Sequence, residues 1–245
     1  MSELLLDFGN SRLKAALLEN ALVNYIGSID TDATHAWHES LGQLVPHPPG
    51  IIWLASVSSS PRTQSLIQFC ESQWETEVKL ISIGDFLKHL PTRYVASQLG
   101  VDRWLAMLGC HVPNGTASLV VDAGTALTLD VVSAAGEHQG GYILPGLRSM
   151  HEALVGATSL SPILDEELVI EDGLARDTAT AVQLGPLRAL AALIHEMLAT
   201  HPEPIELFIG GGDARYIHAI LSQPYTKVDQ MVLQGLSRLV QLEKS

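Results

Sequence analysis

The stretch "LLLDFGNSRLK" (residues 4–14) breaks an apolar run with an acid, then a glycine and short polar residues. The same order returns in "LVVDAGTALTL" (residues 119–129). The matched positions are Asp7 with Asp122, Gly9 with Gly124, and Asn10 with Thr125. A single Asp-x-Gly is a common turn. Two copies in one register, each after an apolar strand, indicate a duplicated structural unit.

The rest of the chain alternates strand and helix patterns around these two turns. Strands are expected at residues 4–6 and 13–18, in the segment that starts at Gly50, and at residues 78–84. Further strands are expected on both sides of the acid–glycine turn at Asp122, after the turn at residues 136–141, and before the glycine turn at residues 210–213. Helices are expected from about residue 102, over residues 184–199 with Pro186 near the first turn, and after the glycine turn at 210–213. A hairpin at the head of each half predicts an α/β protein with mixed sheets.

Composition indicates the size of the domains and the class of partner. The chain has 245 residues, 47% of them hydrophobic, and a formal net charge of −13. The repeat is offset by about half the length, which favours two similar lobes, residues 1–114 and 115–245. The acidic surface disfavours nucleic acid and membranes as partners. No apolar run is long enough to span a bilayer, and no cationic signal segment is seen, so a cytoplasmic protein is expected.

The repeated turn has the groups needed to hold phosphates. Its glycine leaves the backbone N–H open to an anion. The aspartate would repel a phosphate unless a cation, either Mg²⁺ or its water shell, lies between them. Lys14 or Arg12 could add positive charge. The glycine spacings of the P-loop and of dinucleotide folds are absent, so a nucleotide site of another kind is expected.

The segment "GVDRW" (residues 100–104) supplies a candidate base and an anion-binding group. Asp102 could accept the proton of a substrate hydroxyl, and Arg103 could bind a carboxylate. Alternatively, Asp102 caps a helix and Arg103 is solvated. His138, in an expected turn, and His195, on a polar helix face, are interpreted as surface residues. The four tryptophans are interpreted as core.

Four motifs in order, "DFGNSRLK", "GVDRW", "DAGTALT" and "GGYILPGL", resemble the type III pantothenate kinases of the acetate and sugar kinase/actin superfamily. The resemblance extends from residue 7 to residue 236. It implies the actin-like ATPase fold, with two similar lobes and a cleft between them. It also implies a homodimer that uses ATP with Mg²⁺ and a monovalent cation, K⁺ or NH₄⁺.

The resemblance assigns roles to individual residues. Asp102 corresponds to the catalytic proton acceptor, and Asp122 to the ligand of the monovalent cation. The implied ATP-binding residues are Asp7, Phe8, Gly9, Asn10, Ser11, Arg12, Leu13, Lys14 and Thr125. The implied pantothenate-binding residues are Tyr94, Gly100, Val101, Asp102, Arg103 and Thr178. Ser11 replaces the usual threonine, and the segment before Gly100 lacks the usual Asn-Pro or Asp-Pro.

The function expected from the resemblance is ATP-dependent phosphorylation of the primary hydroxyl of pantothenate, the first step of coenzyme A biosynthesis. The residues themselves indicate only a phosphate and metal site with an acid–arginine pair. Two alternatives stay open. One is another small-molecule kinase of the superfamily, acting on a sugar or a carboxylate. The other is a nucleotide-binding regulator without catalysis.

Overall fold

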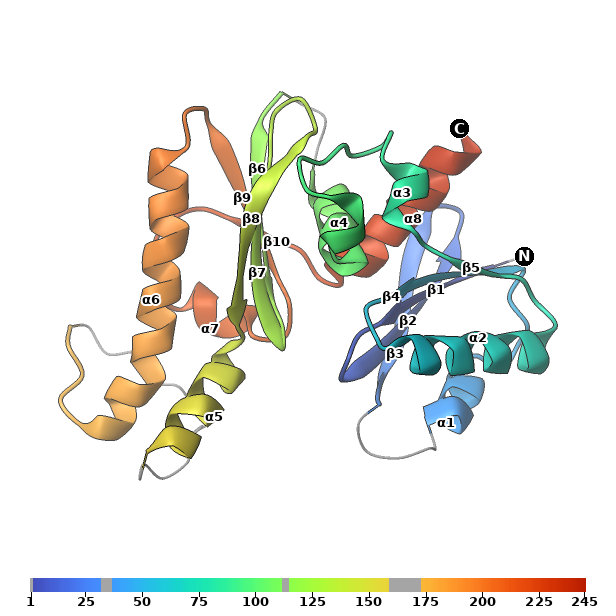
Figure 1. The fold of residues 1–245 in the computed structure, drawn as a ribbon, viewed down its shortest axis with the longest axis horizontal. Helices are drawn as coiled ribbons and strands as arrows, with labels where there is room; N and C mark the ends of the chain where they lie inside the picture. Colours follow the sequence, from blue (N-terminus) through green and yellow to red (C-terminus); the bar gives the residue numbers. More distant parts are fainter. Residues whose placement is uncertain (1, 32–36, 112–114, 159–172) are drawn as a thin grey trace. The chain divides into compact units, whose positions relative to one another are not determined.

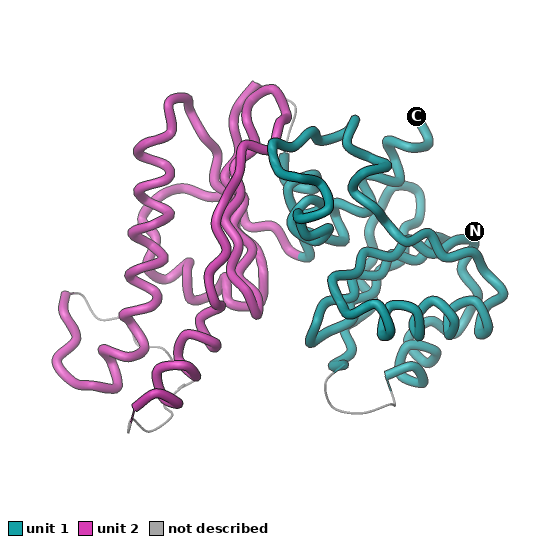
Figure 2. The backbone as a smooth tube through the Cα atoms, viewed as in Figure 1, with its two compact units in different colours: residues 1–111, 230–245 teal, residues 112–229 magenta. Residues whose placement is uncertain are grey.

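The structure is a computed structural model that describes residues 2–31, 37–111, 115–158 and 173–245 (Figure 1). The chain forms two compact units (Figure 2). Unit 1 contains residues 1–111 and 230–245, and unit 2 contains residues 112–229. The first boundary lies close to the one proposed from the repeat. The C-terminal segment, however, packs with the N-terminal half and not with the second half.

Unit 1 is built on a five-stranded mixed sheet. Its strands are β1 (Glu3–Phe8), β2 (Arg12–Glu19), β3 (Leu22–Asp30), β4 (Ile51–Ser56) and β5 (Val78–Leu80). They lie in the order β3-β2-β1-β4-β5. The first three form an antiparallel meander, while β4 pairs parallel with β1 and β5 pairs parallel with β4.

Unit 2 repeats this topology strand for strand. Its strands are β6 (Ala117–Ala123), β7 (Ala126–Val132), β8 (His138–Pro145), β9 (Ile205–Gly210) and β10 (Thr226–Lys227). The order β10-β9-β6-β7-β8 is the order of unit 1 read from the other edge. Antiparallel and parallel pairs also correspond. The prediction of an α/β protein with two similar units, each with a hairpin at its head, is confirmed.

The helices of unit 1 cover both faces of its sheet. They are α1 (Trp37–Leu44), α2 (Ser60–Trp74), α3 (Ile83–Phe86), α4 (Val101–Cys110) and α8 (Met231–Lys244), with a 3₁₀ turn at Ala96–Gln98. Leu4, Leu6 and Phe8 point into the core under α1 and α2. Because side chains alternate along a strand, Leu5 and Asp7 point to the opposite face, where α8 packs (Figure 1).

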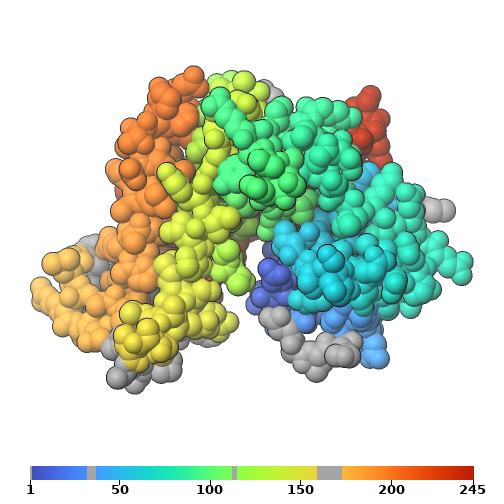
Figure 3. Space-filling model, viewed as in Figure 1, coloured from blue at the N-terminus to red at the C-terminus, as the bar shows by residue number. Residues whose placement is uncertain are grey.

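Unit 2 packs its helices on one face of its sheet. They are α5 (Leu147–Ala157), α6 (Thr178–Thr200) and α7 (Ala214–His218). Val121 and Leu129 contact the α6 residues Leu190 and Ile194 in the core. By alternation, Asp122 points to the other face, as Asp7 does in unit 1. Much of α6 forms surface, as the orange segment of Figure 3 shows.

Helix α6 begins earlier than its apolar pattern predicts. Asp177 is its N-cap residue and accepts a hydrogen bond from the Thr180 N–H. Pro186 therefore lies inside the helix, and the prediction that it occupies the first turn is wrong. Asp177 was missed because a cap is a single residue, whereas the apolar period starts a full two turns later.

Helix α8 packs directly against α4 through two glycines. A Cβ atom on Gly235 would lie 2.0 Å from the Leu105 carbonyl oxygen, and one on Gly109 would lie 2.8 Å from the Gly235 nitrogen. Arg238 of α8 donates to the carbonyls of Leu108 and His111. These are carbonyls that a helix end leaves without partners, so Arg238 caps the C-terminus of α4.

Candidate active site

The first turn joins β1 and β2 and contains the residues expected to meet nucleotide phosphates. Asp7 lies in β1 itself and is paired across the ladder with Lys14 of β2. The turn closes with a hydrogen bond of 2.9 Å from the Gly9 N–H to the Arg12 carbonyl. Asn10 is exposed and Ser11 is half-buried. Phe8 and Leu13 are fully buried, so their side chains belong to the core and only their backbone is available to a ligand.

The second turn, between β6 and β7, is built in the same way. The Gly124 N–H donates to the Ala126 carbonyl over 3.0 Å, and Thr125 is exposed at the tip. The flanking pairs are Phe8 with Leu13 in the first hairpin and Ala123 with Leu127 in the second. The second turn is therefore one residue shorter. Counted from the returning strand, Thr125 corresponds to Ser11, not to Asn10.

Each turn is hydrogen-bonded to two neighbouring segments of its own unit, and these segments occupy corresponding positions in the two units. After the third strand, the Thr31 N–H donates to Ser11 in unit 1, and the Gly146 N–H donates to Thr125 in unit 2, each over 3.0 Å. After the fourth strand of each unit, the Val57 N–H donates to the Phe8 carbonyl in unit 1, and the Asp213 N–H donates to the Ala123 carbonyl in unit 2. The repeat thus includes the supports of the turn as well as the turn.

The glycine turn after β9 approaches the second phosphate turn closely. Gly211 has φ of +91°, and a Cβ atom there would lie 2.3 Å from the Ala123 carbonyl oxygen. A Cβ atom on Gly146 would lie 2.2 Å from the Gly124 carbonyl oxygen. Only glycine fits these two positions, so the backbone of three segments meets beside Thr125.

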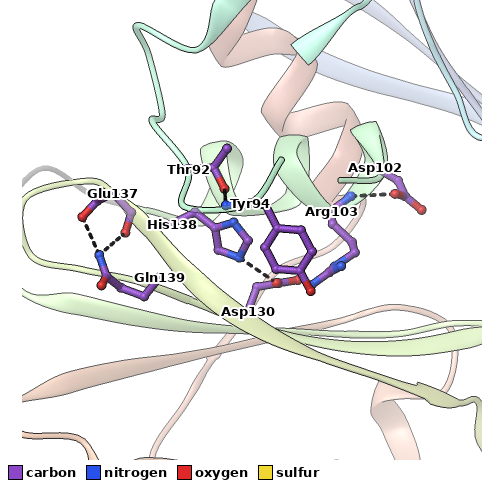
Figure 4. Close-up of polar contacts among 8 residues, drawn as sticks. All are labelled: Thr92, Tyr94, Asp102, Arg103, Asp130, Glu137, His138 and Gln139. Carbon is purple, nitrogen blue, oxygen red and sulfur yellow. Dashed lines mark hydrogen bonds and ion pairs between the residues drawn. The ribbon is translucent and has the colours of Figure 1, made fainter. Parts of the chain in front are cut away.

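The candidate base lies at the N-terminus of α4. Gly100 is the N-cap residue, and Asp102 lies in the first turn with its Oδ1 atom 2.7 Å from the Arg103 N–H (Figure 4). A Cβ atom on Gly100 would lie 2.5 Å from that Oδ1, so glycine leaves room for the carboxylate. Val101 is buried. The positive end of the helix dipole favours a charged Asp102.

Arg103 is a buried residue, only 6% exposed. The alternative that Arg103 is a solvated surface residue is therefore wrong. Its guanidinium carbon lies 5.4 Å from the ring centroid of Tyr94, within cation–π distance. The Tyr94 N–H donates to the Thr92 hydroxyl (Figure 4). Although the segment before Gly100 departs from the family motif, Tyr94 lies beside Arg103.

Thr178 is the first residue of α6 and is exposed. Its neighbour Asp177 accepts from both the backbone N–H and the hydroxyl of Thr180. These hydrogen bonds, the backbone one first, lower the pKa of the Asp177 carboxyl. The N-cap hydrogen bonds of Asp177 therefore fix the backbone of the helix start at which Thr178 lies.

One histidine interpretation is wrong. His138 is fully buried at the start of β8, and its Nε2 atom lies 3.0 Å from Oδ1 of the buried Asp130 in β7 (Figure 4). The expected turn at residues 136–141 is shorter, because β8 begins at His138. A charged residue on the buried strand β7 was a signal that a buried partner must exist. His195 is exposed, and the four tryptophans are buried, as expected.

Within the described residues, no group of three or more acids, histidines or cysteines is arranged to hold a metal ion. Asp122 is a half-buried carboxylate near the end of β6, next to the second turn. Such oxygen donors suit a hard cation. None of the described helices is long and apolar enough to cross a bilayer.

Comparison with known proteins identifies the family. The family model described as type III pantothenate kinase matches residues 3–200. The chain belongs to the type III pantothenate kinase family. A member from Hydrogenovibrio crunogenus is 31% identical over 250 residues, covering 96% of this chain and 97% of its own. One from Pseudomonas aeruginosa is 33% identical over 248 residues, covering 97% and 98%.

Solved structures support the fold of this family member. A Baf family protein from Campylobacter jejuni matches with a TM-score of 0.64 at 20% identity, covering 98% of both chains. MreB5 of Spiroplasma citri bound to AMPPNP matches with a TM-score of 0.55 at 12% identity, covering 99% of this chain and 97% of its own. At these identities the likeness shows the fold alone, which is actin-like.

Proposed function

We propose that this chain transfers the γ-phosphoryl group of ATP to the primary hydroxyl of pantothenate, giving 4'-phosphopantothenate and ADP. This reaction would be the first step of coenzyme A biosynthesis in the cytoplasm. The observation that carries the proposal is the N-terminus of α4 in a member of this family. There, the half-buried Asp102 precedes the buried Arg103, whose guanidinium carbon lies 5.4 Å from the ring centroid of Tyr94.

Asp102 would accept the proton of the substrate hydroxyl as the oxygen attacks the γ-phosphorus. The carboxylate lies in the first turn of α4, where the helix dipole interacts favourably with a negative charge. Arg103 would bind the pantothenate carboxylate with its fork of N–H donors, steadied by Tyr94. Gly100 and Val101 would line the same pocket, and Thr178 would offer a hydroxyl from the start of α6.

The two turns would supply N–H donors to the nucleotide phosphates, with Asp7 directed to phosphate-bound Mg²⁺ and Lys14 adding positive charge. Asp122 and nearby carbonyls would hold K⁺ or NH₄⁺, which offsets the repulsion between that carboxylate and the phosphates. The active form would be a homodimer. Strand β8, at the edge of its sheet, exposes Tyr142 and Ile143 and is a surface that a second copy could cover.

The test is a coupled ADP-release assay with pantothenate, with and without K⁺. We expect turnover that requires both pantothenate and K⁺. A panel of sugars and small carboxylates in the same assay tests the other kinase class. If one of these compounds is turned over faster than pantothenate, that compound and not pantothenate is the substrate. Nucleotide binding without phosphoryl transfer to any of them would favour the regulator.

A further inference from the structure

Arg62, near the start of α2, binds two carbonyls beside the first phosphate turn. Its Nη1 atom donates to the Asn10 carbonyl over 2.9 Å, and its Nη2 atom donates to the Thr31 carbonyl over 3.2 Å. Its guanidinium carbon lies 5.2 Å from the centroid of the Phe8 ring. One side chain therefore joins the helix, the turn and the end of β3.

These bonds determine the direction in which the turn presents its N–H groups. A trans peptide is planar, so the Ser11 N–H points opposite to the Asn10 carbonyl. Arg62 attracts that carbonyl from one side, which leaves the Ser11 N–H directed to the other. The Ser11 carbonyl is likewise bound by the Thr31 N–H. In the part of the chain that the structure describes, the N–H groups of Asn10 and Ser11 donate to no backbone carbonyl.

An anion needs N–H groups, and a carbonyl turned toward it would repel it. A mobile Asn10 peptide would present its oxygen part of the time. The first turn is one residue longer than the second, so it has one more peptide to hold in place. In the second turn, Thr125 is held by the Gly146 N–H and by a longer contact of 3.4 Å from the Ser149 hydroxyl.

The first turn of α2, which carries Arg62, is itself held in place. Helix α2 begins after Ser59, with Pro61 in its first turn. The Thr63 hydroxyl lies 2.7 Å from the Ser56 hydroxyl, which ties the first turn of α2 to the end of β4. A lysine in place of Arg62 would keep the charge, but its single ammonium has no planar fork to orient two carbonyls at once.

We propose that Arg62 is a positioning residue for nucleotide binding, which holds the Asn10 and Thr31 carbonyls so that the Ser11 N–H faces the phosphates. This inference rests on the proposed function for the identity of the ligand. It concerns ATP binding alone and does not depend on the phosphoryl acceptor.

The test compares Arg62→Met and Arg62→Lys with the parent protein. The matched control is Lys79→Ala, which removes another cation stacked on an aromatic ring of unit 1, 4.8 Å from the Trp53 centroid. The measurements are the Kd of MgATP by calorimetry without pantothenate, the KM values of both substrates, kcat, and the melting temperature. Calorimetry gives a readout that needs no turnover.

For Arg62→Met we expect the Kd and KM of MgATP to rise about tenfold, from the loss of two charge-assisted hydrogen bonds. The KM of pantothenate should change less than about twofold, because Arg103 and Tyr94 are untouched. Arg62→Lys should recover only part of the loss, and Lys79→Ala should match the parent. The parent protein could fail to phosphorylate pantothenate while calorimetry gives the expected order of MgATP Kd values among the variants. This result would overturn the proposed function and leave the role of Arg62 intact.

Two results would overturn the inference. Full recovery of MgATP affinity by Arg62→Lys would show that charge alone acts, without orientation of the turn. A lower melting temperature in Arg62→Met with parental MgATP affinity would show that the contacts serve only the stability of unit 1.

Discussion

Lys14 holds its ammonium nitrogen 3.5 Å from the Oδ2 atom of Asp7, directly across the β1–β2 pair. The aspartate side chain is 11% exposed and the lysine side chain is 33% exposed. The pair thus places one acid and one base on the same face of the sheet at the first phosphate turn. Such a pair suits a ligand that carries its own cation, since the acid meets the metal and the base meets the phosphate.

Removal of the Asp7 carboxylate should therefore weaken metal-linked binding. We expect Asp7→Ala to raise the Kd of MgATP at least about tenfold, because a ligand to the metal or its water shell is lost. Pantothenate binding, measured with an ATP-independent probe, should stay near the parental value. An unchanged MgATP affinity in calorimetry would refute the role of the duplicated turn.

Substitution of the candidate base should affect the chemical step. Asp102→Asn keeps the shape of the side chain and removes the proton acceptor. We expect kcat to fall by about 10²–10⁴ with the Kd of MgATP retained. The change is measured by ADP release and calorimetry, with the melting temperature as a check on folding. Near-parental turnover would reassign Asp102 to a structural role at the start of α4.

Activity should respond to a specific monovalent cation. At constant ionic strength we expect the rate to rise with K⁺, and Na⁺ to be a poor substitute. Asp122→Asn should weaken this dependence together with ATP use. Tetramethylammonium at equal concentration supplies screening without coordination and serves as the control. Equal rates in K⁺ and in tetramethylammonium would leave Asp122 as a ligand of Mg²⁺-bound water or a turn residue.

The close packing of α4 on α8 should tolerate no added methyl group. Gly235→Ala would place a Cβ atom 2.0 Å from the Leu105 carbonyl oxygen, so the helices must move apart. We expect a loss of about 1–3 kcal/mol or more in the free energy of unfolding, measured with urea. Gly42→Ala is the control, because its nearest neighbour, Phe69, would be 3.7 Å away. That variant should be neutral or slightly stabilised, and equal losses in both would exclude the packing argument.

Stability should fall in mild acid partly through His111, which is 6% exposed. Burial, and then the positive charge of Arg238, lower the pKa of His111 from its ordinary value of 6.5. The unfolded chain thus takes up the proton at a higher pH than the folded chain. The stabilising contribution is present above the ordinary pKa and is lost as the pH falls through the folded-state pKa.

His111→Gln should accordingly reduce the acid sensitivity. We expect the difference in urea midpoint between about pH 7.5 and about pH 5.5 to be smaller in the variant than in the parent. Exposed His195, replaced by glutamine, is the control and should leave that difference unchanged. A parental difference in His111→Gln would rule out His111 as a contributor.

The sequence predicted the parts of the fold that a local pattern encodes. Two acid–glycine turns in one register indicated two hairpins, and both hairpins exist with matching sheet orders. No local pattern in residues 231–244 indicates which half of the chain they pack against. The return of α8 to unit 1 therefore could not be predicted, since its close approach to α4 depends on Gly109 and Gly235, far apart in the chain.

The candidate site shows the same limit. Asp102 and Arg103 could be singled out because they are adjacent in sequence and chemically distinctive. Arg62 and Thr31 could not, because their contacts with the first turn join segments 21 to 52 positions apart. His138 was misjudged because its partner Asp130 lies across a strand pair, where a register shift at Val131 and Val132 moves the alternation.

The assignment of α8 to unit 1 has a consequence for biosynthesis. Residues 230–245 are synthesised after all of unit 2, yet they cover the helix that carries Asp102. Unit 1 therefore lacks one of its layers until α8 has been made. Until α8 packs on it, the α4 surface around Leu105 and Gly109 is not covered by this helix. We expect the candidate base to reach its final position only after α8 has packed on α4, which makes this surface a point at which a chaperone could act.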